Sequence, residues 1–238
     1  MTEIKFRVES DLLGELKVPA DAYYGVQTQR GINNYKISTT HMYDYPEYII
    51  AMAYVKMAAA SANAELGVLD KGIADAIIAA CKEIVDGRFH DQFPVDMMQG
   101  GAGTSVNMNA NEVIANRALE LMGHKKGEYQ YCSPNDHVNC AQSTNDAYPT
   151  AFRYTFFRMN RNLEKALRDL IASFRAKGEE FKDIIKMGRT QLQDAVPMTS
   201  GQEFNAFANN LEEEIANLER NAVLLKEIIW VAPPSAPV

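Results

Sequence analysis

The sequence predicts an all-α fold, in which a mainly helical N-terminal domain over residues 1–141 precedes two long helices of a helical bundle over residues 142–228. Apolar residues recur at helical spacing in three separate segments before residue 123. After Pro149 the pattern changes to two much longer apolar stripes. With 238 residues, 47% of them hydrophobic, the chain has enough apolar material for one sizeable core or two small ones.

The N-terminal elements follow from local spacing. The first forty residues are turn-rich, with little helical period, and allow short extended pieces. Helical spacing predicts helices over roughly Glu47–Leu66, Asp70–Asp86 and Asn107–Met122. The segments Gly87–Gln99 and Gly123–Ser133 are expected to be connections.

Two sustained apolar stripes predict the long helices. In the first, Phe156, Leu163 and Leu170 recur every seven residues. The second steps by three or four residues throughout, over Phe204, Phe207, Leu211, Ile215, Leu218, Ala222 and Leu225. Stripes of this length are typical of helices that pack in a bundle. We expect Gly188–Ser200 to be the loop that joins them at one end of the bundle.

Composition narrows the class of protein. A net charge of −7 argues against nucleic acid or an anionic membrane as a partner. The N-terminus is polar rather than a signal peptide, and no apolar run is long enough to span a bilayer. The three cysteines have no CxxC spacing, which suits reduced thiols in the cytoplasm. The four histidines are scattered, so no metal site is expected.

The segment Gly100–Glu112, GGAGTSVNMNANE, is the most informative part of the chain. Three glycines in four positions remove the Cβ atoms that would keep a ligand from the backbone, and Thr104 and Ser105 follow with hydroxyl donors. A glycine turn that leads into a helix N-terminus favours anion binding, because free N–H groups and the positive end of the helix dipole point outward together. The alternative is a turn that only caps a helix.

The same chemistry recurs in QSTND (Gln142–Asp146) and GRTQLQD (Gly188–Asp194). Small hydroxyls and amides donate hydrogen bonds to a carboxylate without adding a net charge that would trap an anionic product. The structural alternative for QSTND is helix capping, since Ser, Thr, Asn and Asp all favour N-cap positions. Three such segments in one chain favour the binding interpretation.

Four motifs carry a resemblance to a known family: VPADAYYGVQTQR (Val18–Arg30), NMNANEVIANRALELMG (Asn107–Gly123), SPNDHVN (Ser133–Asn139) and GRTQLQDAVPMT (Gly188–Thr199). From about Glu9 to Ile228 the chain resembles the aspartase/fumarase superfamily. Fumarases of this fold usually read GSGTQSNMN, QSSND and GRTHLQDATP, where this chain has GAGTSVNMN, QSTND and GRTQLQDAVP. All three differences fall on the aspartase side.

The resemblance implies an enzyme that reversibly deaminates L-aspartate to fumarate and ammonia through an aci-carboxylate intermediate, as a cytoplasmic homotetramer without a cofactor. The 142–228 region would then be the first two long helices of the superfamily's central bundle. The residues that would bind substrate are Thr104, Ser143, Thr144, Asn145, Thr190 and Gln191. Ser143 and Thr144 would hold the carboxylate whose charge grows. Asp146 and Asn139 look more like capping or supporting groups.

Gln191 stands where fumarase-like relatives carry a histidine, which implies substrate recognition rather than proton transfer. Two alternatives remain open: a class II fumarase that interconverts fumarate and malate, and a non-catalytic helical fragment that binds dicarboxylates or co-assembles with complete subunits. The superfamily takes its general base from a serine in a loop resembling GSSxMPxKxN. The 238 residues contain no such segment, so no catalytic residue is assigned, and we expect this chain to be inactive by itself.

The last ten residues, 229–238, depart from the superfamily pattern, which would continue much like NLGGTAIGTGL after Ile228. The observed tail, IWVAPPSAPV, is compatible at every codon with that sequence read one base out of frame. We hypothesise that the tail is a frameshift product. Restoring one base after the Ile228 codon of the coding DNA should recover NLGGTAIGTGL, and a DNA sequence in which no single-base change does so would refute the idea.

Overall fold

The computed structural model describes residues 5–100 and 102–228 and is mostly helical. By compactness the chain divides within one long helix, after Thr155, into a first unit and a second unit over Phe156–Glu227. The domain boundary expected at residue 141 stays a prediction. The tail over 229–238 lies outside the described residues.

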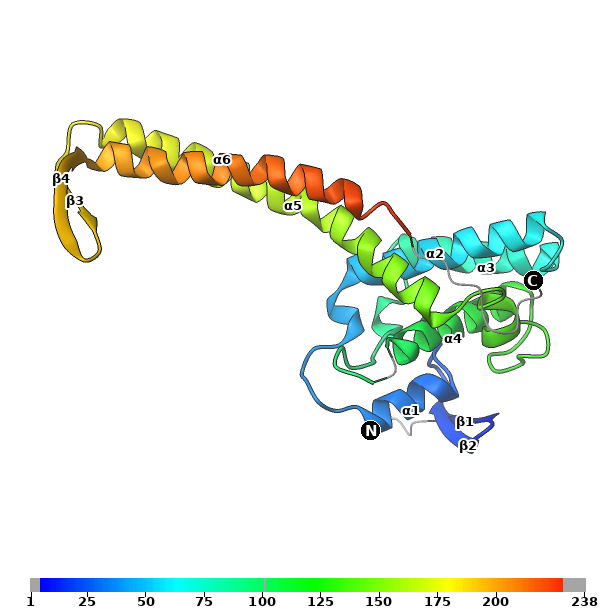
Figure 1. Cartoon of the computed structure of the whole chain (residues 1–238). Helices are drawn as coiled ribbons and strands as arrows, with labels where there is room; N and C mark the ends of the chain where they lie inside the picture. The colour runs from blue at the N-terminus through cyan, green and yellow to red at the C-terminus, as the bar shows by residue number, and fades with distance from the viewer. Residues whose placement is uncertain (1–4, 101, 229–238) are drawn as a thin grey trace. The chain divides into compact units, whose positions relative to one another are not determined.

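The first unit begins with a β-hairpin and then becomes helical (Figure 1). Its strands β1 (Phe6–Asp11) and β2 (Gly14–Pro19) pair antiparallel, from Phe6 opposite Pro19 to Asp11 opposite Gly14. The helices that follow are α1 (Val26–Asn34), α2 (Pro46–Glu65), α3 (Lys71–Val85), α4 (Thr104–Leu121) and the start of α5 (Thr144–Glu180). Three short helices lie between them: η1 (Met42–Asp44), η2 (His90–Gln92) and η3 (Pro134–Val138), the last a π-helix.

Helices α2, α3 and α4 enclose the core of the first unit. Its fully buried members include Ile49, Met52, Ile77, Ile84, Ile114 and Leu119. Local signals set the helix ends: Pro46 occupies the first turn of α2, and Asp70 caps α3 by accepting hydrogen bonds from the N–H groups of Gly72 and Ile73. The three N-terminal helices that the spacing predicted are confirmed within a few residues.

The all-α expectation is wrong in detail, because each unit also contains a two-stranded sheet. One forms among the turn-rich first forty residues, where short extended pieces were allowed. The other replaces the loop expected at Gly188–Ser200, where β3 (Ile185–Thr190) and β4 (Gln193–Thr199) form an antiparallel hairpin. Its two turn residues, Gln191 and Leu192, have φ values of 49° and 64°. Two consecutive left-handed residues are typical of the type I′ turn, whose twist matches that of paired strands.

The start of α5 also differs from expectation. The helix begins at Thr144 and continues through Pro149 instead of starting after it. A proline in the second turn removes one helical hydrogen bond, here the one to the Asn145 carbonyl. Ala147 and Ala151, on either side of Pro149, are completely buried, so packing within the first unit holds this turn in place.

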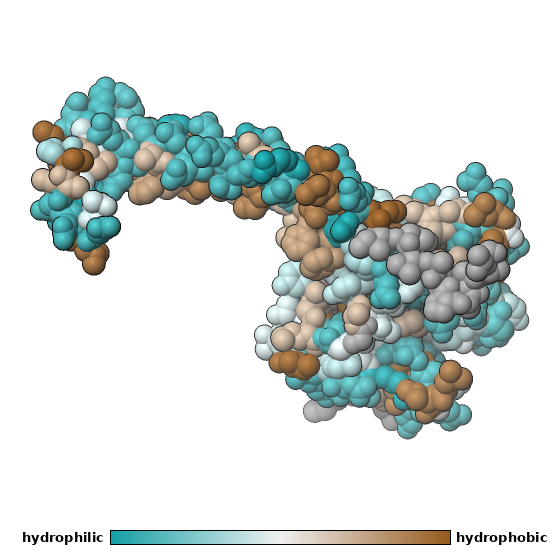
Figure 2. All heavy atoms as spheres, in the orientation of Figure 1, coloured by the Kyte–Doolittle hydropathy of each residue, from teal (hydrophilic) through white to brown (hydrophobic). Residues whose placement is uncertain are grey.

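In the second unit the rest of α5 packs against α6 (Ser200–Leu224) as a helical hairpin. Thr199 and Gln202 start α6 with a reciprocal capping box. Ile171, Ala208 and Ile215 form a small buried core. Much of the apolar stripe stays half-exposed, namely Phe156, Met159, Leu163 and Leu170. Hydrophobic side chains accordingly lie along one edge of the helical hairpin in Figure 2.

Gly103, immediately before α4, packs directly against the ring of Tyr148 on α5. Its φ is +88°, and a Cβ atom at this position would overlap that ring. We expect Gly103→Ala to destabilise the chain by about 2–5 kcal/mol, because left-handed strain of about 1–2 kcal/mol adds to an overpacking cost of about 1–3 kcal/mol. Urea unfolding followed by circular dichroism measures the loss.

Gly123→Ala is the matched control, since Gly123 has a φ of +83° but open space where the Cβ would lie. This variant carries the strain without the overlap. Equal losses for the two variants would show that the contact between Gly103 and Tyr148 contributes nothing.

Candidate substrate-binding site

Two contacts bring the start of α4 next to the start of α5. Gly103 packs against Tyr148, and one turn further along α4 the Asn107 Nδ2 donates to Thr144 Oγ1 at 3.2 Å. Thr104, the first residue of α4, therefore lies near Ser143, Thr144 and Asn145. Four of the six predicted substrate-binding residues come together in this way (Figure 1 shows the two helices).

The site combines two helix N-termini with uncharged donors. A helix N-terminus presents the positive end of the helix dipole, which favours a carboxylate. Thr104 and Asn145 are exposed, and Ser143 and Thr144 are partly exposed, so their polar groups can reach a ligand. In an acidic chain this arrangement supplies a local positive field without surface cations.

The QSTND segment also caps a helix, as the structural alternative proposed. Ser143 Oγ accepts a hydrogen bond from the Asn145 N–H at 3.2 Å, and Asp146 Oδ2 accepts one from the Ser143 N–H at 2.7 Å. The capping role expected of Asp146 is thus confirmed. Capping occupies Ser143 Oγ only as an acceptor, so its hydroxyl hydrogen still provides a donor.

Thr190 and Gln191 belong to the second unit. Both are exposed, Thr190 at the end of β3 and Gln191 as the first residue of the turn between β3 and β4. The hairpin therefore presents them side by side at its tip.

A buried lysine beneath the α5 start is a feature that the motifs did not indicate. Lys56 on α2 is completely buried, and its Nζ donates to Asn139 Oδ1 at 2.9 Å and to Gln142 Oε1 at 3.0 Å. Burial lowers the pKa of Lys56 to about 7. Asn139 thus accepts from this lysine, and a supporting role beside bound substrate stays a prediction. The sequence could have indicated Lys56 in one way, because it is the only cationic residue of the largely apolar helix α2.

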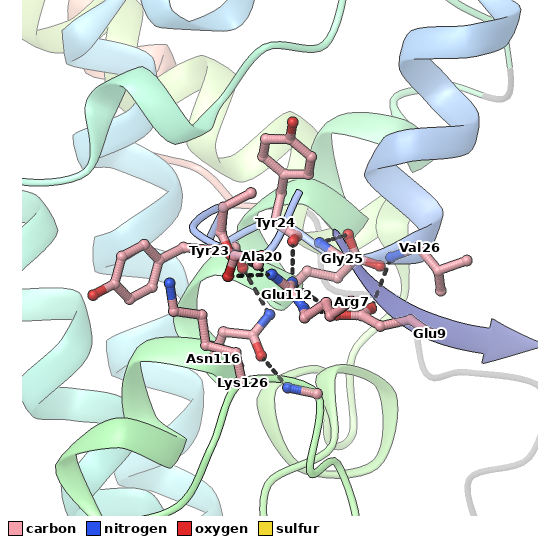
Figure 3. Close-up of polar contacts among 12 residues, drawn as sticks. Arg7, Glu9, Ala20, Tyr23, Tyr24, Gly25, Val26, Glu112, Asn116 and Lys126 are labelled. Atoms are coloured by element: carbon pink, nitrogen blue, oxygen red, sulfur yellow. Dashed lines mark hydrogen bonds and ion pairs between the residues drawn. The ribbon is translucent and has the colours of Figure 1, made fainter. Parts of the chain in front are cut away.

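A second buried cluster organises the VPADAYYGVQTQR segment (Figure 3). The Arg7 guanidinium donates to the backbone carbonyls of Pro19, Ala22 and Tyr24 at 2.7–2.8 Å. It also pairs with the Glu9 carboxylate at 2.7 Å. These bonds fix the path of the chain from β2 to α1.

Two acidic side chains in this cluster satisfy the first N–H groups of α1. Glu112, from α4, accepts hydrogen bonds from the N–H groups of Gly25, Gln27 and Thr28 at 2.7–3.0 Å. Glu9 Oε2 accepts the N–H of Val26 at 2.9 Å. A Cβ on Gly25 would lie 2.5 Å from Tyr129 Oη, so glycine is required where the two carboxyls approach. This motif therefore has a structural role.

Neither a metal site nor a membrane helix is present in the part of the chain that the structure describes. Within residues 5–100 and 102–228, no three His, Cys, Asp or Glu side chains are grouped so that they could hold a metal ion. Over the same ranges, no helix is both long and apolar enough to cross a membrane.

The sequence matches a family described as Lyase over residues 14–231, and the chain belongs to this lyase family. The chain is 60% identical over 223 residues to the aspartate ammonia-lyase of Escherichia coli (strain K12), and 55% identical over 225 residues to that of Corynebacterium glutamicum. These alignments cover 93–94% of the chain but 47% and 43% of the relatives. The chain thus spans about half the length of the curated relatives it matches. The aspartase side of the superfamily, which the motifs indicated, is confirmed.

Solved structures have the same fold. A fumarate lyase:delta crystallin from Brucella melitensis in native form matches with a TM-score of 0.89 and 54% identity, over 93% of this chain and 50% of that one. A class II fumarase from Schistosoma mansoni matches with a TM-score of 0.84 and 35% identity, over 94% of this chain and 47% of that one.

Glu112 should make stability depend on pH. Burial raises the pKa of its carboxyl from 4.5 to about 7, and the three backbone donors oppose that shift. Between pH 4.5 and 7 the folded chain keeps a proton that the unfolded chain releases. The free energy of unfolding should therefore fall as the pH rises, by up to about 1.4 kcal/mol per unit.

Glu112→Gln stays uncharged, so the stability of the parent relative to this variant should decline across the same window. Urea unfolding at several pH values measures the difference. Parallel pH profiles for the two proteins would contradict the assignment.

Proposed function

We propose that this chain carries the dicarboxylate-binding part of an aspartate ammonia-lyase, with L-aspartate and fumarate as substrate and product. The observation that supports it best is the meeting of the α4 and α5 starts, which gathers Thr104, Ser143, Thr144 and Asn145. The relatives described as aspartate ammonia-lyases favour this chemistry over others in the superfamily.

The chemistry requires hydrogen-bond donors of this kind. Deamination removes a weakly acidic proton from the carbon beside the β-carboxylate and expels ammonia from the neighbouring carbon. The carboxylate then takes a second negative charge. A donor already oriented toward developing charge is worth about 3–4 kcal/mol. Ser143 and Thr144 take this role, while Thr104 and Asn145 bind the substrate.

Thr190 and Gln191, at the hairpin tip of the second unit, are also proposed to bind substrate, with Gln191 recognising it. We assign no general base among the described residues, and we propose that the 238-residue chain alone does not turn over aspartate. In the proposed active form the subunits assemble as a cytoplasmic homotetramer, with each site built by three of them. The half-exposed stripe on α5 and the three free cysteines support this assembly and compartment.

The second candidate is a class II fumarase, which the structural similarity to the Schistosoma mansoni enzyme supports. The two activities differ in whether fumarate adds ammonia or water. In a chimera, residues 5–228 replace the matching segment of the Escherichia coli relative. This chimera can be assayed for the addition of ammonia and for the addition of water to fumarate. We expect fumarate absorbance to fall when ammonia is present and to change little with water alone.

The third candidate is a non-catalytic fragment. To test it, the aspartate ammonia-lyase activity of the 238-residue chain is assayed with and without the complete Escherichia coli relative.

Substitutions in the chimera test the individual roles. Thr104→Val keeps the side-chain shape but removes a donor, so aspartate affinity and turnover should both fall, by about 1.5–3 kcal/mol in total. Ser143→Ala and Thr144→Val should lower mainly turnover, because their bonds strengthen as charge develops. Steady-state kinetics separate the two effects.

Thr155→Val is the matched control, since the hydroxyl of Thr155, also on α5, donates to the Ala151 carbonyl. It should leave both constants nearly unchanged. A folded chimera that is inert toward aspartate and ammonium fumarate would refute the proposed function. Unchanged kinetics for Thr104→Val would remove that residue from the site.

A further inference from the structure

We propose that Asn107 and Lys56 are positioning residues that orient the Thr144 hydroxyl through buried hydrogen bonds centred on Asn139. Lys56 Nζ and Asn107 Nδ2 both donate to Asn139 Oδ1, at 2.9 and 3.1 Å. Asn107 Nδ2 also donates to Thr144 Oγ1 at 3.2 Å. The inference rests on the proposed function, in which Thr144 contacts the substrate carboxylate.

The Gln142 carbonyl fixes the orientation of the Asn139 amide. A carbonyl can only accept, so the Asn139 atom that faces it at 3.0 Å must be the amide nitrogen. The Asn139 oxygen then faces Lys56 Nζ, from which it accepts at 2.9 Å. Because Asn139 presents its oxygen, Asn107 must present its nitrogen, and that nitrogen is the group that reaches Thr144.

The consequence for Thr144 is a restricted hydroxyl orientation. A threonine hydroxyl carries one hydrogen, and its torsion is set by its neighbours. Since Asn107 donates to Thr144 Oγ1, the hydroxyl hydrogen must point away from Asn107. Thr144 is partly exposed whereas Asn107 is buried, so the geometry favours a hydrogen that points out of the core. An oriented donor costs no reorganisation when charge develops on a bound carboxylate.

Burial prevents the network from relaxing. Asn107 is 1% exposed and Lys56 is completely buried. Asn111, one turn further along α4, adds a third donor to Asn139 Oδ1 at 3.3 Å. In the described part of the chain Asn107 Oδ1 is buried without a hydrogen-bond partner. A buried polar group that is only half satisfied needs an explanation, and holding Thr144 provides one.

Charge is the second contribution of Lys56. The buried ammonium lies beneath the QSTND turn, where it interacts with Asp146 and Cys81, and these two groups oppose the effect of burial. Asp146 accepts the Ser143 N–H, so the same lysine also supports the cap of α5.

A double-mutant cycle in the chimera tests the positioning role. Asn107→Ala should lower kcat by about tenfold or more and change KM less, whereas in a Thr144→Val background it should cost less than about twofold. The second result follows because no hydroxyl then remains to be oriented. Lys56→Met should show the same dependence on Thr144. Equal costs of Asn107→Ala in both backgrounds would overturn the proposal.

Asn109→Ala is the matched control for a structural effect. Asn109 is also a fully buried asparagine of α4, but its amide donates to the Gln92 carbonyl at 2.9 Å. Its substitution should destabilise the protein without the selective fall in kcat. Similar losses of kcat for Asn107→Ala and Asn109→Ala would also overturn the proposal.

A second measurement uses the 238-residue chain itself and requires no activity. Hydrogen exchange of the backbone amides over 143–147 should accelerate about tenfold in Asn107→Ala and stay near the parent rate in Asn109→Ala. An inert chimera together with this exchange pattern would refute the proposed function but retain the network. Unchanged exchange in Asn107→Ala would refute the network, whatever the chimera does.

Discussion

The close approach of α4 and α5 at Gly103 is the constraint on which the candidate site depends. A side chain at this position would overlap the Tyr148 ring, so only glycine lets the two helix starts come together. That approach places Thr104 beside Ser143, Thr144 and Asn145, and it brings Asn107 within reach of Thr144. A residue without a side chain thus determines where several donors meet.

Buried polar groups hold the surrounding backbone. Glu9 and Glu112 satisfy the first N–H groups of α1, and Lys56 joins two side chains that lie just before the start of α5. Each such group has a high desolvation cost, which only good partners offset. Their combined effect is specificity: alternative packings of these helices would leave a carboxylate or an ammonium unpaired in the core.

The sequence predicts well what local rules control. Helices α2, α3 and α4 carry their own apolar periodicity, and the Thr104 and QSTND segments are recognisable by composition. The sequence predicts poorly those elements and side chains whose structure depends on partners far away in the chain. Helix α1 is largely polar and depends on Glu112, 84–87 residues away, for its first hydrogen bonds. The β3–β4 turn uses Gln191 and Leu192 in left-handed conformations that Asn-Gly would normally signal. Lys56 acquires its partners only when α2 packs against η3 and the α5 start.

The proposed site places uncharged hydroxyls and amides against the ligand and keeps Lys56 away from it, and this arrangement has a chemical reason. In the proposed reaction both substrate and product are dicarboxylates, so a cation in direct contact would hold the product as firmly as the substrate. The groups proposed to touch the ligand are hydroxyls and amides. The amino group of Lys56 is separated from Thr144 by Asn139 and Asn107. Uniform binding of ground states contributes nothing to turnover, whereas oriented donors act when charge develops. A buried lysine behind neutral donors therefore supplies orientation while leaving the product free to dissociate.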